Sequence, residues 1–198
     1  DDVRLLQQSQ IEELFDTLPN TASVDVERGL NSSDIEAMNP FHWIFEFPTA
    51  YNEQQGFDVV LGNPPHGSDI SDLQGEVLDD RYSLTEGRNI EVAKLFTERC
   101  WEMQQRGLSF VIPKAAAYKA NWKDFREYIT EELHRAVDLG EAFSDVNHEQ
   151  ATFHLSTSTD DEYICGYLEE GQNQLYNKSE LDKEFATDLE TILVNLSD

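Results

Sequence analysis

The chain has 198 residues with 39% hydrophobic content, and its 40 acidic and 14 basic side chains give a formal net charge of −26 at pH 7. This length and apolar content are typical of one domain with its own hydrophobic core. The sequence contains no apolar run of about 18 residues and no signal-like start, which excludes the usual signatures of membrane-spanning and secreted proteins and predicts a cytoplasmic location. So large a negative charge also opposes general attraction to nucleic acid phosphates.

The predicted elements begin with an amphipathic helix over residues 3–18, where apolar side chains recur at helical spacing. The apolar run Val59-Val60-Leu61 then predicts a strand over residues 57–61, covered on both faces of a mostly parallel sheet. Residues 67–87 are polar and are expected to form a loop, either a mobile cover over a site or a plain surface connection.

The rest of the sequence alternates between strand and helix patterns. Helices are expected over residues 91–103, 121–133 (capped by Asn121) and 179–196. Strands are expected over residues 108–113, 135–139, 151–156 and 163–168, the last two paired as a hairpin. This alternation predicts an α/β fold whose ligand crevice lies at the carboxyl ends of the strands.

The turn that follows the first strand carries the strongest chemical signal in the chain. Gly62 allows a close backbone approach, and Pro64 and Pro65 fix φ and remove two amide donors. The Asn63 side-chain oxygen and a neighbouring backbone carbonyl can together accept both hydrogens of a planar amino group. The turn therefore predicts a site that binds an exocyclic amine.

Residues Asn63-Pro64-Pro65-His66 resemble motif IV of the amino-group methyltransferases, which hold the amine of adenine or, in some protein methylases, a glutamine amide. In that family an aromatic residue usually occupies the fourth position and stacks on a base flipped out of the duplex. His66 stands there in this chain, and its imidazole offers less stacking area and titrates near neutral pH.

Three further segments resemble the large restriction-modification adenine methylases, in the family's order. They are the Pro-Phe-His-Trp to Glu-Phe-Pro segment at 40–48, the strand ending in Val111-Ile112-Pro113, and the segments at 137–143 and 145–152 that resemble the closure of the target-base pocket. The likeness covers residues 39–168. It implies a Rossmann-like S-adenosylmethionine-dependent methyltransferase fold, with transfer of a methyl group to the N6 amine of a flipped adenine in double-stranded DNA.

The resemblance also assigns roles to individual residues. Asn63 and the Pro64 carbonyl would orient the amine, and Pro65 and His66 complete the catalytic motif. His148, Glu149 and Gln150 would contact the target strand. Lys114 and Lys119 are expected to contact DNA, because they lie in the one segment that is not strongly acidic: residues 81–135 hold ten basic and eight acidic side chains.

The family's glycine-rich cofactor loop has no equivalent in residues 1–56, so no cofactor-binding residue is assigned. We expect a helical lead-in at 1–38, the catalytic-motif half of the methylase domain at 39–170, and an acidic helical tail or the start of a following domain at 171–198. The cofactor-binding half would come from an upstream segment or a companion chain, since the chain begins at Asp1 and is expected to be a piece of a longer polypeptide.

Several alternatives stay open at this point. The chain could be a non-catalytic fragment or subunit that contributes DNA contacts or assembly, or a protein-glutamine methyltransferase that shares the Asn-Pro-Pro turn. The excess of acidic residues favours adaptation to molar internal salt, as in halophiles, over mimicry of an acidic partner. Cys100 and Cys165 form no zinc pattern and are expected to be free buried thiols, and no metal site is expected.

Overall fold

The computed structural model describes residues 46–50, 56–65, 70, 72–85, 90–143, 148–158, 160–169 and 174–196. These residues fall into two compact units. The first unit includes helix α5 (Asp72–Arg81), and the second contains the sheet and the helices that pack on it. The helix expected over residues 3–18 lies outside the described residues. No helix in the described part of the chain is long and apolar enough to cross a lipid bilayer.

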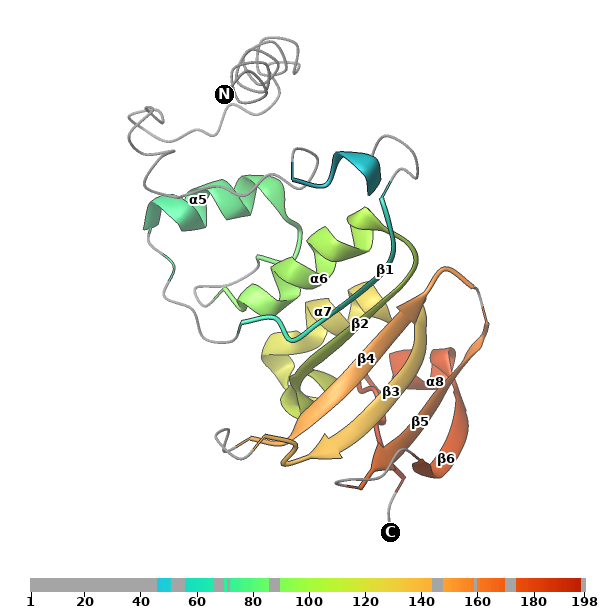
Figure 1. Cartoon of the computed structure of the whole chain (residues 1–198). Coiled ribbons are helices and arrows are strands. Elements are labelled where there is room, and N and C mark those ends of the chain that lie inside the picture. The colour runs from blue at the N-terminus through green and yellow to red at the C-terminus, as the bar shows by residue number, and fades with distance from the viewer. Residues whose placement is uncertain are drawn as a thin grey trace. The chain divides into compact units, whose positions relative to one another are not determined.

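The second unit is built on a six-stranded mixed sheet (Figure 1). Its strands, in spatial order, are β1 (Phe57–Gly62), β2 (Gln104–Pro113), β4 (Gln150–Ser156), β3 (Leu133–Gly140), β5 (Glu162–Leu168) and β6 (Leu175–Asp182). β1 and β2 pair in parallel, as do β3 and β5, whereas β4 and β6 are antiparallel to their neighbours. The carboxyl ends of β1, β2 and β3 therefore meet the start of β4 at one end of the sheet, and we call this end the carboxyl edge.

The hydrophobic core lies between one face of this sheet and the helices behind it (Figure 1). These helices are α6 (Val92–Met103), the 3-10 turns η1 (Lys114–Ala117) and η2 (Ala120–Trp122), α7 (Lys123–Ile129) and α8 (Lys183–Asp188). Phe125 of α7 packs edge-on against both Trp122, at 5.2 Å, and Phe153 of β4, at 6.1 Å between ring centroids. Burying an aromatic side chain of this kind contributes roughly 1.5–3 kcal/mol.

Two buried charged side chains fix the helical layer. Lys94 of α6 is 3% exposed, and its ammonium lies 2.6 Å from Asp124 and donates to the Asn121 carbonyl at 2.8 Å. Glu98, one turn further along α6, accepts hydrogen bonds from the backbone amides of Ser83 and Leu84. These contacts join α6 to α7 and to the segment that precedes α6, and they satisfy charges that would otherwise be costly to bury.

Most of the predicted strands are confirmed, but their pairing differs from the prediction. The hairpin expected between 151–156 and 163–168 is wrong, because β3 lies between these two strands and pairs with both. The expected cover over both faces of β1 is not found among the described residues: β1 lies at the edge of the sheet, with Val59 48% and Leu61 73% exposed.

Three helix predictions also need correction. The helix expected over 179–196 is wrong except at α8, since residues 175–182 form strand β6 and residues 191–196 form no helix. This last segment is hydrogen-bonded to the sheet, with the Gly166 amide of β5 donating to the Val194 carbonyl. The helix expected at 121–133 is confined to α7, where Trp122 rather than Asn121 holds the cap position. The polar stretch 67–87 contains helix α5 rather than loop alone.

Candidate active site

The turn after β1 is placed by the pairing of β1 with β2. Gly62 pairs with Phe110, and a Cβ added at Gly62 would lie 3.1 Å from the Phe110 ring, so only glycine fits this close approach without a shift. Asn63 then leaves the sheet two residues before the level of Pro113, the last residue of β2. Asn63 is exposed, whereas Pro64 is buried. The arrangement anchors the turn through a proline and leaves the asparagine amide accessible.

The end of β2 meets β3 and β4 through one lysine. The Lys114 ammonium lies 2.7 Å from Oδ2 of Asp138 on β3 and 3.3 Å from Oε2 of Glu149, which directly precedes β4. The Lys114 amide also donates to the Glu149 carbonyl at 2.9 Å. Asp138 is only 6% exposed, and its second oxygen accepts from the Gly140 amide at 2.9 Å. One cation thus holds together three strand ends at the carboxyl edge.

The charge state of Lys114 follows from these contacts. Partial burial lowers the pKa of the Lys114 ammonium, but the hydrogen bonds and attraction from Asp138 and Glu149 outweigh it, so the net pKa is raised above its ordinary value. Lys114 is therefore fully protonated at neutral pH, and its charge is shared by two carboxylates of the same chain.

The segment expected to contact the target strand divides into exposed and buried parts. His148 and Glu149 are exposed. Gln150 is 2% exposed, and its side-chain amide donates to the His148 carbonyl at 3.0 Å. The Gln150 side chain therefore stabilises the conformation of the two residues that precede β4, while His148 and Glu149 are exposed to solvent.

The remaining predicted site residues are less closely connected. Lys119 is exposed, and its backbone carbonyl accepts from the buried Arg126 guanidinium at 2.8 Å. His66 lies outside the described residues. The structure brings Lys114, Glu149 and Gln150 together at the carboxyl edge, at the end of the sheet where Asn63 also emerges.

Sequence reasoning missed Asp138 as a member of this cluster. A carboxylate placed between Val137 and Leu139 was the signal that could have found it, since a charged residue between apolar neighbours in a strand needs a partner. The basic segment 81–135 also proves to be partly structural, because Lys94 and Arg126 are buried and hydrogen-bonded inside the unit.

Residues 3–143 match the family model described as Eco57I restriction-modification methylase. Because this match covers well over half of the chain, the chain belongs to that family. Over 48 residues it is also 40% identical to a protein of Methanocaldococcus jannaschii named as a type II restriction enzyme and methyltransferase. That match covers 24% of this chain and 4% of the relative, so the chain spans a small part of the relative's length.

Solved structures of restriction-modification proteins resemble the fold. The type IIG restriction endonuclease BpuSI superposes with a TM-score of 0.52 at 17% identity, over 70% of this chain and 20% of its own. A type I methyltransferase subunit of Streptococcus thermophilus gives a TM-score of 0.49 at 18% identity, over 66% and 30% of the two chains. A protein of Listeria monocytogenes assigned to the class I S-adenosylmethionine-dependent methyltransferases gives 0.47 at 18% identity, over 57% and 37%. The α/β methyltransferase fold expected from the sequence is confirmed.

Proposed function

We propose that this chain carries the amine-binding part of a restriction-modification DNA methyltransferase that methylates the N6 amine of adenine. The observation that carries the proposal is the turn after β1, where Gly62 packs on Phe110, Pro64 is buried and Asn63 is exposed at the carboxyl edge. Crevices at this edge are where open α/β sheets bind their ligands. The family membership makes methylation the chemistry to assign to this turn.

In this proposal the turn acts by accepting hydrogen bonds. The Asn63 side-chain oxygen and the Pro64 carbonyl accept the two hydrogens of the adenine amine and stabilise positive charge as it develops on nitrogen. His66 stacks on the flipped base. His148 and Glu149 contact the target strand, and Lys119 contacts a DNA phosphate, because all three are exposed. Gln150 and Lys114 support them by shaping the carboxyl edge.

S-adenosylmethionine supplies the activated methyl group in this chemistry. The glycines in and beside the sheet do not form a cradle for it: a Cβ added at Gly56, Gly62, Gly107 or Gly166 would meet atoms of this chain within 3.1 Å, and Gly140 faces open space. We therefore assign no described residue to the cofactor. The proposal places its binding site in an upstream segment or a companion chain.

The uncovered strand β1 supports the need for a further segment. Among the described residues no strand pairs with its outer edge, and Val59 and Leu61 are 48% and 73% exposed. An exposed apolar edge strand is a template for pairing with another chain or segment. The same observation favours the second candidate function, a non-catalytic fragment that serves assembly.

The composition supports a proposal about the environment. With a charge of −26 and only six lysines, the chain is suited to a cytoplasm at molar salt, where the Debye length is about 3 Å and self-repulsion is screened. At that ionic strength, DNA affinity rests on direct contacts more than on long-range attraction.

Methyl transfer from labelled S-adenosylmethionine to adenine-containing duplex DNA in molar KCl tests the function, with the chain assayed together with the segment or companion chain that carries the cofactor site. We expect N6-methyladenine as the product and a loss of about 100-fold or more in Asn63→Ala, comparable to removing one polar group that stabilises developing charge. Asn121→Ala is the matched control, because Asn121 contributes a backbone carbonyl that the substitution retains. Transfer to a protein glutamine instead would identify the other class of methyltransferase. No transfer by this complete, folded assembly would support the non-catalytic fragment hypothesis.

A further inference from the structure

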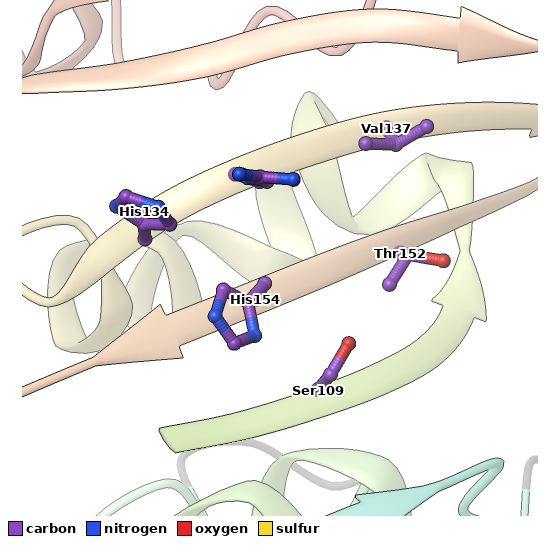
Figure 2. A pocket seen from close by; sticks show the side chains of 6 residues that line it. Ser109, His134, Val137, Thr152 and His154 are labelled. Atoms are coloured by element: carbon purple, nitrogen blue, oxygen red, sulfur yellow. The ribbon is translucent and has the colours of Figure 1, made fainter. Parts of the chain in front are cut away.

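The pairing of β3 with β4 contains a β-bulge that gathers basic side chains on one face of the sheet. Leu133 pairs with Leu155, and the next pair is Arg135 with His154. β3 therefore advances by two residues where β4 advances by one, and His134 is the extra residue of the bulge. A bulge re-aims side chains and places the two residues of its longer strand toward the same side. His134 and Arg135 consequently flank His154. Figure 2 shows His134 and His154 side by side on adjacent strands.

These residues line a shallow cavity of about 400 Å³ on the sheet face. Its lining consists of two imidazoles, one guanidinium, two hydroxyls and one apolar side chain, contributed by His134, Arg135, His154, Ser109, Thr152 and Val137 (Figure 2). Among the described residues no carboxylate lines the cavity, although the chain has 40 acidic and 14 basic residues. The cavity is therefore rich in hydrogen-bond donors and in potential positive charge.

The cationic groups of the cavity repel one another. The ring centroids of His134 and His154 are 5.6 Å apart. Burial lowers the pKa of His154, and the charges of His134 and Arg135 lower it further, against a smaller opposing effect of the Leu108 backbone. The carboxylate of Asp160 lies 3.9 Å from Nδ1 of His134, and its side chain is 64% exposed. A second anion inside the cavity would relieve the repulsion between these groups.

The backbone of β2 makes room for the His154 ring. A Cβ added at Gly107 would lie 3.3 Å from Cε1 of His154 and 2.9 Å from the Leu155 carbonyl oxygen. Glycine at this position lets the imidazole lie over the neighbouring strand. The cavity thus depends on a bulge in β3 and a glycine in β2, two independent features of the backbone.

We propose that this cavity binds an oxyanion of the phosphate class. The Arg135 guanidinium contacts the anion through charge-assisted hydrogen bonds, and the two imidazoles and the hydroxyls of Ser109 and Thr152 supply further donors. The cavity is lined by residues of β2, β3 and β4, and its lining includes neither Asn63 nor its neighbours in the turn after β1. The inference does not depend on the proposed methylation.

Titration of inorganic phosphate into the full chain in molar KCl tests the inference, with the imidazole resonances of His134 and His154 followed by NMR at pH 6 and pH 7.5. High salt screens distant charges, so direct contacts dominate the response. We expect saturable shifts of both rings and a rise in the pKa of His154 when phosphate binds. In Arg135→Gln the affinity should fall by about tenfold or more, as expected for the loss of a charge-assisted contact.

Arg106→Gln is the matched control, because Arg106 is 77% exposed, pairs with Asp58 and does not line the cavity. It removes the same charge and should leave the phosphate affinity within about twofold. Absence of saturation in the wild-type chain, or an equal loss of affinity in the two variants, would overturn the inference. A duplex oligonucleotide then identifies the source of the anion: if it displaces phosphate the cavity takes a phosphodiester, and if it does not the cavity takes a free phosphate.

Discussion

The ammonium of Lys114, at the end of β2, lies 2.7 Å from the carboxylate of Asp138, near the end of β3. β4 lies between these two strands in the sheet, so the ion pair spans a strand and also reaches Glu149, which directly precedes that strand. The pair fixes the relative positions of three strand ends at the edge where Asn63 emerges. A cation expected from the sequence to contact DNA is thus also a structural element of the candidate site.

Removing the cation from this cluster should destabilise the fold. In Lys114→Met the Asp138 carboxylate, which is 6% exposed, keeps its hydrogen bond from Gly140 but loses its charged partner. We expect the free energy of unfolding to fall by about 1–3 kcal/mol, the usual range for a hydrogen bond to a charged group. Urea denaturation in constant KCl measures the change.

Lys119→Met controls for the loss of one positive charge, because Lys119 is exposed. Its effect should stay within about 0.5 kcal/mol, as for other surface substitutions. Combining Lys114→Met with Asp138→Asn should cost less than the sum of the single changes. Additive effects would contradict a direct coupling between the two residues.

The histidine pair on the sheet face predicts a pH dependence of stability. Burial, His134 and Arg135 hold the pKa of folded His154 below its ordinary value of 6.5. The unfolded chain therefore takes up the proton first, and stability should fall as pH drops below about 6.5, levelling off below the folded pKa. In His154→Gln this part of the pH dependence should disappear. An unchanged stability profile between pH 7 and pH 5 would count against the repulsion within the cluster.

A tyrosine hydroxyl binds the C-terminal segment to the sheet. The hydroxyl of the buried Tyr163 donates to the Leu193 carbonyl at 3.3 Å and accepts from the Leu193 amide at 3.0 Å, and burial raises its pKa to about 12. In Tyr163→Phe two backbone groups lose their partner, so we expect a loss of about 1–3 kcal/mol and faster amide hydrogen exchange at Leu193. Exchange at Leu193 that matches the wild-type rate would show that the hydroxyl does not hold this segment.

Salt should stabilise the folded chain strongly. With a net charge of −26, the compact state suffers self-repulsion that added ions screen. We expect the thermal midpoint to rise continuously between 0.1 and about 1 M KCl, the range over which the Debye length falls from about 10 Å to about 3 Å. Calorimetry in KCl measures this, and a midpoint that is constant above 0.3 M would argue against adaptation to molar salt.

The sequence predicted those features that depend on local pattern. The strand before Asn63, the helix at 92–103 and the strands β2 to β5 follow from apolar periodicity, which is read within a few residues. The position of Asn63 at a strand end followed for the same reason. Pairing is a property of the whole sheet, and the sequence order of β4 and β5 concealed the fact that β3 lies between them.

The remaining differences also have physical causes. The residues of β6 are polar because β6 is an edge strand with little burial, so the acidic segment resembled a helix more than a strand. The partnership of Lys114 with Asp138 joins residues 24 positions apart, and no spacing rule relates them. The bulge at His134 is likewise visible only in the register of paired strands.

The measurement that tests the account most directly is whether Asn63 recognises the amine of adenine. The full chain in molar KCl is titrated with a duplex that carries adenine opposite an abasic site, and with an identical duplex that carries purine, which lacks the amino group. The account predicts that the adenine duplex binds about tenfold more tightly, as expected for two hydrogen bonds to one amino group, and that Asn63→Ala abolishes this difference. Equal affinity of the wild-type chain for the two duplexes would contradict the central claim.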